Sequence, residues 1–418
     1  MNDATFGGPG EVSFSINVTE AGKYFIWART LAPKVRGERR SFYVTGNGTK
    51  IREWSARRST TWKWNKVGKV SLPVGTFNLA FRQRDDGTKL DRIVLTSERR
   101  FAPPAPTGPA PSQDFTIIAL PDTQFYSRDL SPIFSAQTQW IVNNKDLMNI
   151  VYVAQLGDCV ENANLTTEWD YADAAMSLIE NPNTTGLLHG IPYGIAVGNH
   201  DQTPQGSPTG NSTQLYNSYF GESRFMGRTY YGGHFGTNND NHFSLFSASG
   251  MDFIVVYLEF DPAANPTVLA WADDLLKTHV NRRAIVVSHY ITEAGNPAPF
   301  GNQGQAIYDT LKGNANLFLM LAGHRPEEGR RTDIFNGNTV HTLMSDYQGR
   351  VNGGDGWLRI LEFSPVNNEI RVRTYSPTLD QFETDANSQF TLIYDMIPTS
   401  NVPPVTRVGP DQEITLPN

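Results

Sequence analysis

The chain has 418 residues, of which 39% are hydrophobic and 18% are charged, and its formal net charge is −7. This length favours two domains with linkers, and the composition provides for packed cores and excludes global disorder. The negative charge argues against a general nucleic-acid or anionic-membrane binder. No apolar run reaches the roughly 20 residues that a membrane helix needs, so no membrane partner is expected. Cys159 is the only cysteine, so no intrachain disulfide can form.

Residues 1–100 predict an all-β domain. Apolar and polar residues alternate over 11–18 and, more loosely, over 23–29, and further short runs follow at 41–45, 62–70, 76–83 and 90–96. Gly, Asn and Asp residues separate these runs. Regular short strands with turn residues between them indicate a β-sandwich or jelly roll.

Three segments of this domain, residues 21–29, 62–68 and 87–96, resemble the later strands of bacterial galactose-binding-like carbohydrate-binding modules. The opening strand and the acidic residues of that family are not visible. The resemblance implies a carbohydrate partner, with Trp54, Trp62 and Trp64 as candidates to stack on sugar rings. The alternative is that these aromatic side chains belong to the core, as most do.

Residues 101–113 contain five prolines and predict an extended linker. A second domain is expected over 114–397. Residues 398–418 resemble a linker and the opening of a PKD-type, immunoglobulin-like repeat. The N-terminus lacks the basic and apolar segments of a signal peptide. We therefore expect a piece of a longer, modular, bacterial-style protein that is secreted, periplasmic or on the cell surface.

From residue 115 the pattern changes to alternating strands and helices. Helices are predicted over 131–148, where Pro132 suits a first helical turn, and over 167–180 and 265–279. A β-hairpin is predicted over 243–260, and two strands, 358–363 and 370–375, are expected to form a second sheet. Residues 202–241 predict a long loop beside the site.

Five short apolar runs in this domain each end in a potential metal ligand. The runs are 115–120, 151–156, 192–197, 284–288 and 317–322, and the ligands that follow them are Asp122, Asp158, Asn199, His289 and His324. In open α/β sheets, ligands gather outside the carboxyl ends of the strands. Carboxylate, amide and imidazole donors together predict a divalent-metal site.

In chain order these residues resemble the calcineurin-like metallophosphoesterase superfamily, whose pattern is D-x-H, G-D, G-N-H-[DE], a lone His and G-H-x-H. The resemblance implies a four-layer α/β sandwich that follows the jelly roll. It also implies two divalent ions (Mn, Mg, Fe or Zn) and hydrolysis of a phosphoester by a metal-bound hydroxide. A phosphodiester is expected over a monoester, because an open first metal site admits bulky groups.

Carried over by position, the resemblance assigns ligands to both ions. One ion is expected on Asp122, Gln124 and Asp158, and the other on Asp158, Asn199, His289 and His324. His200 is expected at the substrate as general acid, with Asp201 orienting its ring. The candidate substrate contacts are Asn162, Tyr126, Arg330 and Arg331.

Two positions depart from the family pattern. Gln124 and Pro326 stand where the family has histidines of the first metal site. A Gln oxygen is a weaker donor and Pro offers no side-chain donor, so this site should favour Mg²⁺ or Mn²⁺ over Zn²⁺. The site is expected either to be more open and hold more waters, or to be filled by a neighbour such as Glu327, Glu328 or His341.

Two other functions remain open. The first is a weakened phosphoesterase-like protein that acts as a secreted carbohydrate-binding or adhesion module. The second is a single-metal hydrolase of esters other than phosphoesters. Both follow from the loss of the two family histidines at positions 124 and 326.

Overall fold

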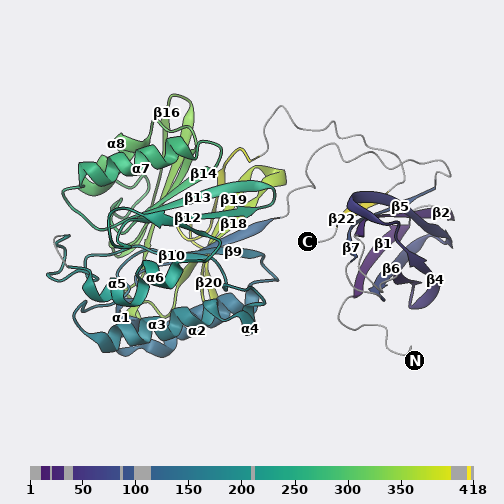
Figure 1. Ribbon diagram of the computed structural model, residues 1–418, viewed down its shortest axis with the longest axis horizontal. Coiled ribbons are helices and arrows are strands. Elements are labelled where there is room, and N and C mark those ends of the chain that lie inside the picture. The colour runs from purple at the N-terminus through teal and green to yellow at the C-terminus, as the bar shows by residue number, and fades with distance from the viewer. Residues whose placement is uncertain are drawn as a thin grey trace. The chain divides into compact units, whose positions relative to one another are not determined.

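The computed structural model describes residues 11–18, 21–32, 41–84, 88–97, 114–208, 212–396 and 412–415. The chain divides into two compact units, Met1–Pro111 with Ser400–Asn418 and Ser112–Thr399 (Figure 1). The predicted linker, residues 101–113, and most of the predicted PKD-like tail lie outside the described residues. No helix in the described parts of the chain is long and apolar enough to cross a membrane.

The first unit contains two antiparallel four-stranded sheets. One sheet has the order β1-β6-β3-β4, formed by Glu11–Val18, Gly75–Gln83, Ser41–Gly46 and Thr49–Ser55. The other has the order β22-β7-β2-β5, formed by Gln412–Thr415, Lys89–Thr96, Gly22–Ala32 and Ser59–Leu72. Strand β22 comes from the C-terminal tail and pairs with β7, so the tail contributes to the first unit.

Alternation of side chains builds the core of this unit. Phe77, Leu79 and Phe81 of β6 are all buried while Asn78 between them is exposed, as the two-residue period of a strand requires. Trp54 belongs to the same core, where its ring stacks on Phe42 at 5.8 Å. Trp54 is therefore not available to a sugar, which corrects one of the three tryptophan candidates.

The other two tryptophan candidates keep their status as predictions. Trp64 is half-buried, and the side chain of Trp62 lies outside the described residues.

The second unit contains two seven-stranded sheets. The first has the order β10-β9-β8-β18-β19-β20, with β21 also paired to β19, formed by Tyr193–Ile195, Ile150–Gln155, Phe115–Leu120, Leu358–Ser364, Glu369–Ser376, Gln381–Glu383 and Phe390–Ile393. The second has the order β11-β12-β13-β14-β15-β17-β16, formed by Tyr231–His234, His242–Ala248, Met251–Leu258, Arg283–Ser288, Leu317–Ala322, Asn338–Asp346 and Glu327–Phe335. The first sheet is parallel over β10, β9 and β8, and the second is parallel over β13, β14, β15 and β17.

Helices cover the outer faces of the two sheets (Figure 1). The helices are α1 to α8, formed by Gln124–Asp129, Ser131–Asn144, Thr166–Glu180, Pro182–Thr185, Gln214–Phe220, Glu222–Phe225, Pro266–Thr278 and Asn302–Leu311, with 3₁₀ turns at Val351–Gly353 and Pro365–Asn367. Helices α2 and α3 pack on the β8 sheet, and α7 and α8 pack on the β14 sheet. A third core lies between the sheets, where Phe115 and Phe253 meet at 5.6 Å. The α/β prediction is confirmed.

Several details differ from the sequence predictions. Strands β18 and β19 form, but β18 pairs with β8, so they extend the first sheet and do not make a separate one. Helix α2 ends at Asn144, four residues early, and the chain then turns through Asn149, whose φ is 49°. The predicted loop over 202–241 contains α5, α6 and β11.

Candidate metal centre

Two buried side chains and a half-buried one converge at the carboxyl ends of strands from both sheets. Asp158 follows β9, His289 follows β14 and His324 follows β15, and one ligand atom from each lies within 4.8 Å of the others. Asp158 Oδ2 lies 3.0 Å from His289 Nε2, which lies 3.2 Å from His324 Nδ1. A carboxylate and two imidazoles at this spacing are a donor set for a divalent cation.

The backbone around these residues is held in unusual conformations. Asp158 and His324 both have positive φ angles, 49° and 76°, which non-glycine residues seldom adopt. Two glycines allow the close approach of carboxylates. A Cβ atom on Gly198 would lie 2.1 Å from Asp158 Oδ1, and one on Gly323 would lie 2.2 Å from Asp122 Oδ2. The chain therefore positions these carboxylates with tight backbone contacts.

Asp122 and Gln124 lie beside this cluster. Asp122 follows β8 and is 3% exposed, its Oδ1 lies 3.7 Å from His289 Nε2, and its carboxylate accepts the backbone N–H of His324 at 3.1 Å. Gln124 begins α1, and its Nε2 donates to Glu161 Oε2 at 2.8 Å. The structure thus brings these residues to the same edge of the sheets.

Two amide oxygens at the centre have no hydrogen-bond partner. They are Asn199 Oδ1 and Gln124 Oε1, and both are buried. A buried polar atom left unpaired costs about 1–3 kcal/mol, so such an atom needs an explanation. Coordination of a cation would satisfy both oxygens. The residues present therefore fit the divalent metal that the sequence predicts.

The two histidines have opposite pKa shifts. Burial alone would lower the pKa of His289, but the carboxylates of Asp158 and Asp122 outweigh it and raise the pKa to about 10. Burial and the nearby charge of His289 lower the pKa of His324 to about 3. The carboxylates of Asp158 and Asp122 thus favour a positive charge beside them. A metal ion bound to His289 would displace the proton from its ring.

His200 lies at the rim of the cluster. Its backbone N–H donates to Asp158 Oδ1 at 2.8 Å, and its side chain is 20% exposed. Ring atom Nδ1 lies 2.9 Å from the carbonyl oxygen of Glu161, and Nε2 lies 2.7 Å from Gln205 Nε2. The orienting contact of this ring therefore comes from Glu161, which the sequence analysis did not select.

Asp201 has a different role from the one expected. Its fully buried carboxylate accepts the backbone N–H groups of Gly198 and Val160, at 2.8 and 3.1 Å. Burial and the charge of Asp158 raise the pKa of Asp201 to about 7. The expectation that Asp201 orients the His200 ring is wrong, because Asp201 instead ties together the two loops that carry Asp158 and Asn199.

Two candidate substrate contacts are engaged elsewhere. Tyr126 is 3% exposed in the core, and its hydroxyl accepts the backbone N–H of Gly356, so the expected substrate contact is corrected. Asn162 is exposed, and its Nδ2 donates to Glu168 Oε1 at 2.7 Å. Asn162 keeps a second N–H and its Oδ1, so its predicted substrate contact stays a prediction.

Arg330 and Arg331 lie along β16 and not at a strand end. Arg331 forms a two-pronged ion pair with Asp333, both bonds 2.7 Å long, and its guanidinium covers the Phe300 ring. Arg330 covers the Phe390 ring at 4.1 Å. These contacts correct the expectation of phosphate contact, because both guanidinium groups are held by neighbours outside the cluster.

The residues expected to replace the missing histidine are also engaged elsewhere. Glu327 pairs with Arg350, Glu328 pairs with buried Arg359, and His341 Nε2 contacts the carbonyl oxygen of Ile393. A carboxylate that was not selected, Asp346, instead lies at the end of β17 and is fully buried. The signal was present in the sequence, since Asp346 follows an extended run just as the other five ligands do.

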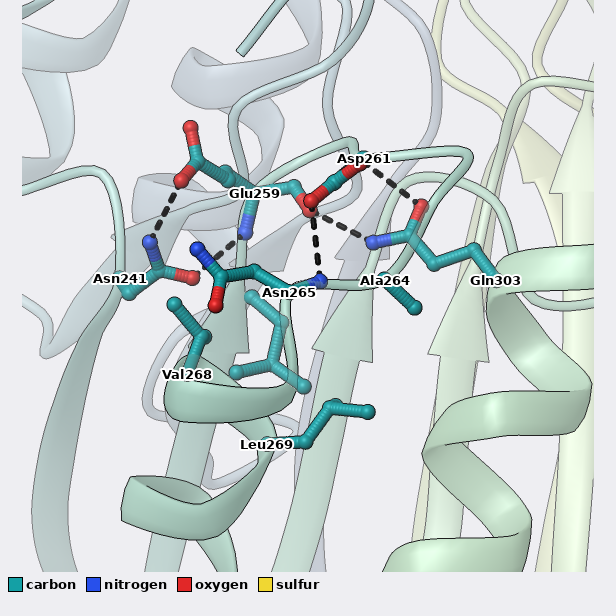
Figure 2. Close-up of a pocket in the computed structure, with 9 residues that line it drawn as sticks. Asn241, Glu259, Asp261, Ala264, Asn265, Val268, Leu269 and Gln303 are labelled. Atoms are coloured by element: carbon teal, nitrogen blue, oxygen red, sulfur yellow. Dashed lines mark hydrogen bonds between the residues drawn. The ribbon is translucent and has the colours of Figure 1, made fainter. Parts of the chain in front are cut away.

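A small cavity is lined in part by the segment that follows β13 (Figure 2). Glu259 and Asp261 line it, and Asn241 Nδ2 donates to Glu259 Oε1 at 2.9 Å. Phe260 between them packs on the cluster, 5.2 Å from the His324 ring. At about 10 Å³ the cavity has room for a single water at most. No residue of the metal cluster lines it, so it is not the substrate site.

Comparisons with known proteins give distant similarities. No family model matches the chain. The uncharacterized protein YvnB of Bacillus subtilis is 34% identical over 303 residues, which are 69% of this chain and 22% of YvnB. The chain therefore spans about a fifth of the length of this curated relative.

The similar solved structures include two phosphatases and a carbohydrate-binding module. A dimetal phosphatase from Danio rerio is 14% identical with a TM-score of 0.42, covering 67% of this chain and 99% of that one. Purple acid phosphatase PPD1 from yellow lupin is 14% identical with a TM-score of 0.44, covering 92% and 72%. A family 35 carbohydrate binding module from Clostridium thermocellum is 19% identical with a TM-score of 0.18, covering 21% and 70%. TM-scores below 0.5 do not establish a shared fold, so function is inferred from the site.

Proposed function

We propose that the second unit is a metal-dependent phosphoester hydrolase. The observation that carries the proposal is the convergence of Asp158, His289 and His324, together with the unpartnered buried oxygens of Asn199 and Gln124. Buried charges in proteins are paired or coordinate metals. Divalent cations held here would stabilise the negative charge that develops on phosphoryl oxygens during hydrolysis.

The chain's own residues supply positioning and proton transfer. Asp158, bonded to the His200 backbone, links the metal cluster to the rim where a substrate would enter. His200 is the candidate general acid for the leaving oxygen, because its ring is partly exposed and Glu161 fixes the orientation of Nδ1. Protonation of a leaving group by a positioned imidazole contributes about 10²–10⁴-fold to a rate.

A phosphodiester is the substrate class that we propose. A phosphomonoester carries a second negative charge and gains more from a fixed guanidinium clamp. The arginine next to the cluster in sequence, Arg325, is paired with Glu293, and Arg330 and Arg331 are held by other neighbours. Among the described residues the site thus lacks such a clamp, which supports a singly charged diester.

Hydrolysis by Mn²⁺-loaded protein tests this function. We expect the wild-type chain to cleave bis(p-nitrophenyl) phosphate faster than p-nitrophenyl phosphate, and Asp158→Asn to lose roughly 10³-fold in kcat/KM, because a bound cation contributes several kcal/mol of charge stabilisation. Asp240→Asn is the matched control, since Asp240 is equally buried but bonds to Thr213 and Asn217.

Two outcomes would contradict the proposal. One is equal phosphoester turnover in Asp158→Asn and the wild type. The other is faster turnover of p-nitrophenyl acetate or sulfate than of either phosphoester, which would instead support a hydrolase of other esters.

A further inference from the structure

Asp346 emerges beside His324 at the same edge of the second sheet. Strands β15 and β17 are parallel neighbours, and Ala322 is paired with Met344 in their register. His324 and Asp346 each stand two residues beyond this pair. Because parallel strands advance together, both side chains leave the sheet at its carboxyl end, where the other ligands lie.

The carboxylate of Asp346 is buried without a cationic partner. It accepts the backbone N–H of Gln348 at 2.8 Å and the side-chain Nε2 of the same residue at 3.0 Å. Among the described residues, no Lys or Arg forms an ion pair with it, whereas buried Glu328 on β16 is paired with Arg359. A fully buried carboxylate of this kind requires a proton or a cation nearby.

Asp346 lies on the Asp122 side of the cluster. The carboxylate of Asp122 accepts the backbone N–H of His324, and His324 follows β15 beside the end of β17, where Asp346 lies. Gln124 Oε1, buried and without a partner, belongs to the same side. Two carboxylates and an unpaired amide oxygen therefore lie where the sequence leaves one metal site short of a ligand.

We propose that Asp346 is a metal ligand that fills the position for which Pro326 offers no donor. This inference rests on the proposed function, because it requires that the cluster binds divalent ions. The ion on this side would be held by oxygen donors alone, from Asp122, Gln124, Asp158 and Asp346. Such a set selects Mn²⁺ or Mg²⁺ over Zn²⁺, whereas the side with His289 and His324 accepts Zn²⁺ or Mn²⁺.

Metal stoichiometry of Asp346→Asn tests this assignment without relying on activity. Equilibrium dialysis of stripped protein against Mn²⁺, followed by elemental analysis, should give two equivalents in the wild type and in Asp240→Asn. Asp346→Asn should keep one equivalent and bind the second at least about tenfold more weakly, since even outer-shell changes cost 10–100-fold. The Mn²⁺ electron paramagnetic resonance signal should change from a coupled pair to an isolated ion.

Each outcome bears on one of the two proposals. Two equivalents of unchanged affinity in Asp346→Asn would overturn the ligand assignment and leave the proposed function standing. A single equivalent in the wild type that Asp346→Asn leaves unchanged would overturn it as well. No binding by the wild-type chain would overturn the proposed function itself. The melting temperature of the metal-free variant confirms that the change acts on a folded protein.

Discussion

The two sides of the cluster differ in the chemistry of their donors. One side combines a carboxylate and an amide with two imidazoles, from Asp158, Asn199, His289 and His324. The other side offers only oxygen, from Asp122, Gln124 and the proposed ligand Asp346. Both sides lie at the same edge of the sheets, and in the proposed assignment they share Asp158. With this assignment, one arrangement of strand ends would present two different metal preferences, because the donor atoms and not the strands select the ion.

The largest of these effects is expected from a substitution that displaces Asp158 and so disrupts metal binding on both sides of the cluster. A Cβ atom on Gly198 would lie 2.1 Å from Asp158 Oδ1 and 2.2 Å from its backbone nitrogen, so Gly198→Ala must displace the carboxylate that both sides share. We expect a fall in kcat/KM of at least about 100-fold, equal to about 2.7 kcal/mol of activation free energy, and a loss of both metal equivalents.

Gly313→Ala is the matched control for this change, because a Cβ atom there meets nothing within 4 Å and the φ angle is ordinary. Two metal equivalents in Gly198→Ala would contradict the proposal that Asp158 is a ligand on both sides of the cluster.

A smaller effect is expected when an imidazole donor is added to the side of the cluster that has only oxygen donors. Gln124→His replaces a weak amide donor with an imidazole, at the cost of the hydrogen bond to Glu161. We expect Zn²⁺ to bind this side roughly tenfold more tightly, measured by competition with a chromogenic chelator, while the other side keeps its affinity.

Gln305→His on the exposed face of α8 controls for adding a histidine, since the Gln305 side chain bonds to Asp309 of the same helix. Unchanged Zn²⁺ affinity in Gln124→His would show that Gln124 does not face the metal.

A separate effect, on stability and not on the metal site, concerns a buried histidine outside both sides. Burial lowers the pKa of His242 to about 4 from the ordinary 6.5, and its ring stacks on Tyr257 at 4.5 Å. As pH falls below 6.5, His242 binds a proton in the unfolded chain but not in the folded chain. The free energy of unfolding therefore decreases. Between pH 7 and pH 5 the loss should be about 2 kcal/mol.

Urea unfolding of metal-free protein at these two pH values checks this prediction. His242→Gln cannot titrate here, so its free energy of unfolding should fall by less than that of the wild type. Equal losses in the two proteins would contradict the assignment.

The sequence predicted the parts of this structure that local pattern determines. The apolar runs before Asp122, Asp158 and His289 predicted both the buried strands and the candidate ligands. This was possible because each candidate follows closely after its strand in sequence. The helix predicted over 265–279 also forms, as α7, and Asn265 accepts the N–H of Thr267 at its start. Local chemistry is readable without knowledge of the fold.

Contacts between distant segments were not predictable in this way. The pairing of β15 with β17 brings Asp346 to the same sheet edge as His324, and Glu328 pairs with Arg359 from another strand. In these two cases strand register, and not sequence proximity, decides which charges meet. Arg331 was missed for a local reason, since its partner Asp333 lies two residues away, where alternate residues of a strand share a face.

Anomalous diffraction at the manganese edge from crystals grown with Mn²⁺ tests the central claim most directly. The account predicts two anomalous peaks beside Asp158, one within 2.5 Å of an imidazole nitrogen of both His289 and His324, and one surrounded by oxygens that include Asp346. Crystals that show no anomalous peak near Asp158, with Mn²⁺ present at saturating concentration, would contradict a metal centre at these strand ends.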